Sequence, residues 1–305
     1  MEYDTLVLSG GSINSISIIG GLQYVKDNNM MENINTYIGT SAGAIICYLL
    51  IIGYTPVEIV VYLCINHHLF EKLKCFDILN AVRGDGATTF MYISDQLEKM
   101  TIDKIGRLLT LKDIETIFNK KLICVTYNIT KASVEYLSSE TNPELPCLIA
   151  LRMSANLPLI FEHFKYENSF YIDGGIVNNF AVDIGEKYGK KVLGICLGVN
   201  NMNSPQDNPS DNILEYIYTL LLVPMVQSMK YKIKSKSDTT TVVELRCSGN
   251  IKMFNFDINS KTKLEMFSLG YEDTKNVFNK QSPELADSVD ASLKKEASSA
   301  ADPAP

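Results

Sequence analysis

The sequence predicts an α/β protein with a central, mostly parallel β-sheet flanked by helices, and three observations lead to this fold class. Residues 5–8 form a short, apolar, β-branched run, which is typical of a buried parallel strand. Glycines and then a helical pattern over 15–28 follow this run, as at the start of a βαβ unit. The alternation of helix and strand resumes over 182–197.

The periodicity of apolar residues and the positions of turn residues divide the chain into further elements. In the first half we expect a strand over 36–39, helices over 41–52, 55–68, 90–100 and 111–119, and strands over 121–128 and 131–137. In the second half we expect a helix over 145–156, short strands over 161–164 and 169–172, helices over 182–188, 211–233 and 263–279, and strands over 191–197 and 240–245. Thr55 before Pro56, and Thr110 three residues before Asp113, are typical N-caps where two of these helices begin.

Composition limits the domain count and the classes of partner. The 305 residues are 46% hydrophobic and contain no interior linker, so we expect one domain over 1–280. Residues 281–305 are rich in Ser, Ala, Glu, Asp and Pro, which predicts a flexible low-complexity tail. A formal net charge of −7 argues against nucleic acid as a partner.

Sequence features also predict the cellular setting. The 7 cysteines are scattered without paired spacing, so we expect reduced thiols and neither a metal site nor a cofactor. No secretory signal and no segment of about 18 uninterrupted apolar residues is visible. These features predict a cytoplasmic protein whose contact with membranes, if any, is peripheral.

The stretch that organises the chain is Gly39-Thr40-Ser41-Ala42-Gly43. A Gly-x-Ser-x-Gly pattern between a strand and a helix is the sequence form of a nucleophile elbow, in which a sharp turn exposes the serine hydroxyl. Small neighbours are needed because the serine backbone is strained. The serine then lies at a helix N-terminus, where backbone N–H groups favour developing negative charge.

Two glycine-containing stretches have more than one interpretation. Ser9-Gly10-Gly11-Ser12 follows the first strand and is a plain tight turn, a phosphate-binding loop, or a source of oxyanion-hole N–H groups. The full Gly-x-Gly-x-x-Gly fingerprint of a nucleotide site is absent, which disfavours the second interpretation. Asp173-Gly174-Gly175 ends a predicted strand, and its glycines allow a sharp turn and a close approach to another loop.

Together these three stretches, with Arg152-Met153-Ser154-Ala155-Asn156-Leu157-Pro158 before the last of them, resemble the patatin-like phospholipases over residues 6–197. The resemblance implies a three-layer patatin-like sandwich, the domain over 1–280, and a metal-free lipid acyl hydrolase of phospholipase A or lysophospholipase type. It implies Ser41 as the nucleophile and Asp173 as its general base, with Gly39, Gly43, Gly174 and Gly175 as motif glycines. The backbone N–H groups of Gly10, Gly11 and Ser12 would form the oxyanion hole. The implied partner is a phospholipid or another acyl-ester lipid.

The scarcity of histidine favours the same base without the resemblance. A serine needs a base within hydrogen-bond reach, and the chain has only His67, His68 and His163. His67 and His68 stand near the end of a predicted helix, where a cation is favoured by the helix dipole. His163 precedes Asp173, whereas an α/β-hydrolase triad places the histidine after the acid.

The first loop departs from the family pattern Gly-Gly-Gly-x-Arg/Lys-Gly. Ser12 replaces the third glycine, Asn14 the basic residue and Ser15 the last glycine. Loss of one oxyanion donor typically costs about 3–4 kcal/mol of transition-state stabilisation. The alternative is therefore a catalytically weakened member that binds lipid or acyl chains.

Overall fold

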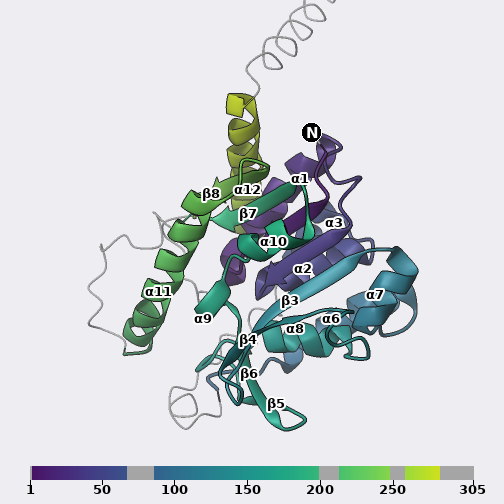
Figure 1. Ribbon diagram of the computed structural model, residues 1–305, viewed down its shortest axis with the longest axis vertical. Coiled ribbons are helices and arrows are strands. Elements are labelled where there is room, and N and C mark those ends of the chain that lie inside the picture. The colour runs from purple at the N-terminus through teal and green to yellow at the C-terminus, as the bar shows by residue number, and fades with distance from the viewer. Residues whose placement is uncertain (1, 67–85, 199–212, 248–257, 282–305) are drawn as a thin grey trace, which may run out of the picture.

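The computed structural model describes residues 2–66, 86–198, 213–247 and 258–281. An eight-stranded sheet lies at its centre. Hydrogen-bonded neighbours follow the path β5-β6-β3-β2-β1-β7-β8, and β4 also pairs with β3. Figure 1 shows α6, α7 and α8 grouped near β3 and β4, and α12 at the opposite end beside β8. The expected histidine pair at 67 and 68 lies outside the described residues. Of the tail expected over 281–305, Gln281 is the last residue of a helix and the rest lies outside the described residues, so the boundary of the domain stays a prediction.

The elements follow the expected alternation. The strands are β1 (Thr5–Leu8), β2 (Thr36–Thr40), β3 (Lys121–Asn128), β4 (Ser133–Leu137), β5 (Phe164–Tyr166), β6 (Ser169–Asp173), β7 (Val192–Leu197) and β8 (Thr240–Leu245). The helices are α1 (Ile16–Asp27), α2 (Ala42–Ile51), α3 (Pro56–Ile65), α6 (Met91–Ile105), α7 (Leu111–Phe118), α8 (Cys147–Ser154), α9 (Gly175–Asn178), α10 (Val182–Tyr188), α11 (Ile213–Ser235) and α12 (Ser260–Gln281). A 3₁₀ turn, η1 (Ser12–Ser15), precedes α1.

The sheet is mostly parallel, and its central strands β1, β2 and β7 are buried on both faces. Strands β1, β2, β3, β7 and β8 pair in parallel, whereas β4, β5 and β6 are antiparallel to their neighbours. Alternate residues of β1 enter different cores, because side chains alternate along a strand. Leu6 and Leu8 pack in the larger core with residues of α1 and α2, and Val7 packs in a second core with residues of α10 and α11. This arrangement of helices, sheet and helices confirms the expected sandwich.

Strand β3 is the element that brings distant parts of the chain together. Along one edge of β3, β2 runs in parallel and ends where Thr40 lies opposite Val125. Strand β4 pairs with the other edge of β3, so β6 must lie along the same edge as β2. It approaches from the opposite direction and ends with Asp173 opposite Thr126. The ends of β2 and β6 therefore meet beside consecutive residues of β3.

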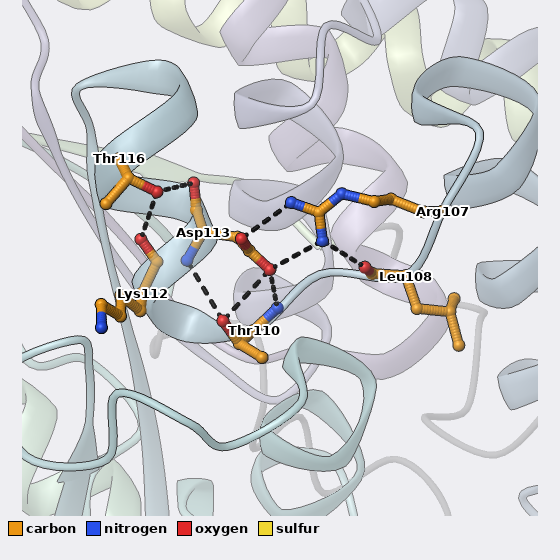
Figure 2. Close-up of polar contacts among 6 residues, drawn as sticks. All are labelled: Arg107, Leu108, Thr110, Lys112, Asp113 and Thr116. Atoms are coloured by element: carbon orange, nitrogen blue, oxygen red, sulfur yellow. Dashed lines mark hydrogen bonds and ion pairs between the residues drawn. The ribbon is translucent and has the colours of Figure 1, made fainter.

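Two helix starts that the sequence predicts are confirmed as capping boxes. In α7, the Asp113 N–H donates to Thr110 Oγ1 (3.2 Å) and the Thr110 N–H donates to Asp113 Oδ2 (2.9 Å), as Figure 2 shows. The Arg107 guanidinium pairs with the same carboxylate at 2.8 Å and is the largest cause of lowering the pKa of Asp113 to about 2. In α3, Thr55 and Glu58 form the equivalent pair of bonds, with Pro56 in the first turn.

Some expected boundaries are wrong. The short strand expected over 161–164 begins only at Phe164, because Phe161 is buried and pairs with Thr88 in an isolated bridge. The helix expected over 90–100 continues to Ile105, where Gly106 with φ of 82° ends it. Within the described ranges, no single helix is long and apolar enough to be a membrane span. Helices α2 and α3, which are bent by 119° relative to each other, have the length and composition of a span only when taken as a pair.

Candidate active site

Ser41 lies at the junction between β2 and α2 in a strained backbone conformation, with φ of 56° and ψ of −127°. A non-glycine residue adopts such angles only where the surroundings enforce them. The two motif glycines explain how the turn closes: a Cβ at Gly39 would overlap Ala44, and a Cβ at Gly43 would lie 2.6 Å from the Ser9 carbonyl oxygen. The expected elbow geometry is therefore present.

Ser154 supports this turn, and the sequence analysis gave it no role. The Ser41 N–H donates to Ser154 Oγ at 3.0 Å, and that hydroxyl donates to the Val125 carbonyl oxygen at 2.6 Å. Both bonds are buried, so the elbow is tied to β3 through the end of α8. The only signal in the sequence was the position of Ser154 in the stretch before Pro158.

Asp173 lies at the end of β6 and is only 1% exposed. Its Oδ1 accepts the Gly175 N–H at 2.6 Å, and its Oδ2 accepts no hydrogen bond in the described part of the chain. Burial raises the pKa of Asp173 to about 6. The Ser41 hydroxyl, which lies close to the carboxylate without completing a hydrogen bond in this conformation, and the Gly175 N–H lower it by less. A carboxyl group with this pKa is largely ionised at pH 7 and can still hold a proton transiently.

The motif glycines let this acid approach the elbow. A Cβ at Gly174 would overlap the Val125 carbonyl oxygen, and one at Gly175 would lie 2.8 Å from Asp173 Oδ1. The expected sharp turn after Asp173 is followed by the one-turn helix α9. The chain can enter that turn only because neither position carries a side chain.

The first loop lies directly against the elbow, but one of its expected oxyanion donors is already used. The Gly10 N–H donates to the Asn179 carbonyl oxygen at 3.3 Å, and Asn179 Nδ2 donates back to the Gly10 carbonyl oxygen at 3.4 Å. In this conformation the Gly10 N–H is therefore engaged by Asn179 and fixes the loop, and its contribution to the oxyanion hole stays a prediction. A Cβ on Gly10 would also lie 2.9 Å from Ser41 Cβ, so only glycine fits there.

The N–H groups of Gly11 and Ser12 donate to no acceptor among the described residues. Ser12 has φ of 51°, which is a conformation that favours glycine. The residue at the position of the family's third glycine thus keeps the backbone shape of a glycine at some cost in strain.

No described histidine joins the site. His163 is exposed and follows Glu162 in the segment before β5. Among the described residues, no group of three or more His, Cys, Asp or Glu side chains could hold a metal ion.

Two cavities meet at Ser41. The smaller, of about 40 Å³, also contacts Asp173, Gly11 and Ser12 and is covered by Leu221, Leu222 and Met225 of α11. The larger, of about 180 Å³, is apolar and is lined by helices α1, α2, α3 and α6 and the segment after α8. A serine in a strained strand–helix turn, next to a buried carboxylate and an apolar cavity, has the arrangement of a serine esterase site.

Comparisons with known proteins place the chain in one family. The sequence model of the patatin-like phospholipases matches residues 6–185, more than half of the chain. The protein therefore belongs to the patatin-like phospholipase family, as its three motifs predict.

Several known proteins resemble the chain in sequence or in fold. The chain is 40% identical over 195 residues, 62% of its length, to "Probable lipid hydrolase 463L" of Invertebrate iridescent virus 6, and the match spans 65% of that protein. It is 27% identical over 281 residues to "Uncharacterized protein R571" of Acanthamoeba polyphaga mimivirus, covering 90% of this chain and 93% of that one. VipD from Legionella pneumophila has the same fold, with a TM-score of 0.52 and 14% identity over 92% of this chain and 67% of VipD. The type III effector protein ExoU also matches with a TM-score of 0.52, at 13% identity, over 91% of this chain and 53% of ExoU.

Proposed function

We propose that the protein is a lipid acyl hydrolase of phospholipase A or lysophospholipase type, which cleaves carboxylic esters with a Ser41–Asp173 dyad. The observation that carries the proposal is the meeting of β2 and β6 along β3, which puts a strained serine next to a buried acid whose pKa is raised to about 6. Strain at the serine and a base with a pKa near 7 are typical of an activated nucleophile.

In the first half-reaction, Ser41 Oγ attacks the ester carbonyl carbon while Asp173 takes the hydroxyl proton. The carbonyl oxygen becomes an oxyanion, and the N–H groups of Gly11 and Ser12 stabilise it. When the tetrahedral intermediate collapses, the bond to the leaving alcohol breaks and Asp173 returns its proton to that oxygen. The product is an acyl group on Ser41.

In the second half-reaction, water attacks the acyl carbon and gives a proton to Asp173. The second tetrahedral intermediate collapses, the bond to Ser41 Oγ breaks, and the serine recovers its proton from Asp173. The fatty acid leaves as the second product. Every proton is returned, so the cycle needs neither a metal nor a cofactor.

The lipid part of the proposal rests on apolar surface at the site. The larger cavity offers an acyl chain an almost entirely apolar lining next to Ser41. On α11, whose Leu221, Leu222 and Met225 cover the dyad, Leu220 and Val223 are 53% and 49% exposed. We propose that these two side chains make the peripheral membrane contact, because apolar residues beside a lipid site gain free energy from insertion into a membrane surface.

The alternative function, passive binding of a lipid or acyl chain, is not favoured. Binding alone requires neither the backbone strain of Ser41 nor the buried acid at Asp173. The altered first loop also retains two unused N–H groups, at Gly11 and Ser12, among the residues that the structure describes.

The test is hydrolysis of phospholipid and lysophospholipid vesicles, with released fatty acid measured for the wild type and for Ser41→Ala and Asp173→Asn. Both variants are expected to lose at least about a thousandfold in kcat, because each removes a group that acts in the transition state. Matched controls are Ser268→Ala on α12 and Asp103→Asn on α6, which change the same residue types at exposed positions. Near-normal turnover by Asp173→Asn would refute the dyad, and fatty-acid release that survives Ser41→Ala would refute the serine mechanism.

A further inference from the structure

The larger cavity forms a channel that extends from Ser41 along helix α2. Ala42, Ile45, Ile46 and Leu49 of α2 all line it, and residues three or four apart lie on one side of a helix. The channel therefore follows α2 away from Ser41, towards the C-terminal end of that helix. Its near end contains the reacting serine.

Helix α6 forms a second wall and runs in the same direction. At the near end, the Phe90 ring packs edge-on against Phe161, with ring centres 5.0 Å apart. Phe161 belongs to the segment after α8, whose Leu157 lines both cavities at Ser41. At the far end, the hydroxyls of Tyr48 and Thr101 are 2.9 Å apart. Phe90 therefore lies at the near end of the channel, and the last turns of α6 lie beside the end of α2.

Buried apolar side chains line the far end of the channel. Leu49 and Met100 line it there and are only 4% and 3% exposed. Ile59 and Leu97, which line the cavity with them, are also buried. A hydrogen bond on the channel wall, from the Tyr62 hydroxyl to Gln96 Oε1 at 2.6 Å, joins two lining residues to each other.

The length of the channel follows from helix geometry. From Ala42 to Leu49 is seven residues, or about 10 Å at 1.5 Å per residue, and from Phe90 to Met100 is ten residues, or about 15 Å. An extended hydrocarbon chain advances about 1.25 Å per carbon, because its carbon–carbon bonds of about 1.5 Å meet at tetrahedral angles. The channel thus has room for about 8–12 carbons.

We infer that the enzyme is selective for acyl chains of about 8–12 carbons, with Leu49 and Met100 as the stop that sets the upper limit. The inference rests on the proposed function, because it assumes that the acyl chain enters the channel from Ser41. Longer chains would have to bend back or remain outside, and shorter ones would leave apolar surface at the far end unused.

The experiment is the chain-length dependence of kcat/KM for p-nitrophenyl esters of 4, 6, 8, 10, 12 and 16 carbons, measured below their aggregation limits. We expect kcat/KM to rise by up to about fourfold per carbon, to peak at 8–12 carbons and to fall at least tenfold by 16. Met100→Ala removes part of the stop, so its optimum is expected to move two or three carbons longer. The matched control is Met266→Ala, which truncates another buried methionine, in α12, outside the channel.

The outcomes separate this inference from the proposed function. Ser41-dependent hydrolysis that is flat with chain length, or fastest at 16 carbons, would overturn the chain-length limit and leave the lipid hydrolase standing. An unshifted optimum in a well-folded Met100→Ala protein would remove Met100 from the stop. If Met100→Ala does not fold, the wild-type profile decides the length limit, and Met100→Val, a smaller truncation, tests whether the optimum moves to longer chains. No Ser41-dependent hydrolysis at any length would refute the proposed function itself.

Discussion

Replacement of Asp173 by Asn is expected to make the protein more stable at neutral pH while it removes activity. Burial raises the pKa of Asp173 from 3.8 to about 6, so between these values the folded protein binds this proton more tightly than the unfolded chain does. The contribution of Asp173 to the free energy of unfolding is therefore present at low pH and is lost as pH rises through 6. The amide of the Asp173→Asn variant does not titrate, so that variant would carry no such dependence.

The magnitude follows from linkage. Because the folded-state pKa is about 6, the free energy of unfolding of the wild type falls by about 1.4 kcal/mol between pH 5 and pH 8, and that of the Asp173→Asn variant does not. For a domain of this size that difference corresponds to a shift of about 3 °C in Tm. The assay is the difference in Tm, or in the free energy of unfolding from urea titrations, between Asp173→Asn and the wild type at pH 5, 6, 7 and 8. The difference should grow in favour of the variant with increasing pH, and parallel curves would refute the raised pKa.

Three further substitutions test the geometry of the site. Ser12→Gly should raise the free energy of unfolding by roughly 0.5–1 kcal/mol, because φ of 51° favours glycine, and should raise kcat/KM. Urea denaturation and ester kinetics measure these changes, and a loss of stability would contradict the prediction. Ser154→Ala leaves the Ser41 N–H and the Val125 carbonyl without their buried partner. We therefore expect about 1–3 kcal/mol of destabilisation and about a tenfold lower kcat with an unchanged pH midpoint. An unaltered kcat would show that Ser154 does not position the elbow. Glu162→Gln removes the charge partner of buried Arg152, at 2.8 Å, and should lower the free energy of unfolding from urea titrations by about 1–3 kcal/mol. Glu144→Gln, from an exposed pair with Lys112 at 3.6 Å, should lower it by almost nothing. Equal effects of the two variants would contradict this reasoning.

The fold and the motif residues could be predicted from the sequence because their signals are local. A short apolar run followed by glycines and a helical pattern identifies a βα unit without knowledge of the rest of the chain. The strain of Ser41 follows from the spacing of Gly39 and Gly43 in the same way. The capping boxes at Thr55 and Thr110 need only residues three positions apart.

The remaining features depend on contacts between distant segments. The meeting of β2 and β6 requires the register of both strands on β3, which no local pattern gives. Gly10 was expected to be an oxyanion donor because the family motif counts glycines, but its N–H is satisfied by Asn179, 169 residues further along the chain. Ser154 was missed for the same reason, since its two partners come from the end of β2 and from β3.

The most direct test of the dyad is the covalent labelling of the wild type with a fluorophosphonate, read by mass spectrometry of the peptides across a range of pH. We expect a single adduct on Ser41, formed at a rate that increases with pH around a midpoint near the pKa of about 6 for Asp173, and no adduct in Ser41→Ala. A well-folded wild type that takes no label, or a label on another serine, would contradict the claim that Ser41 is an activated nucleophile.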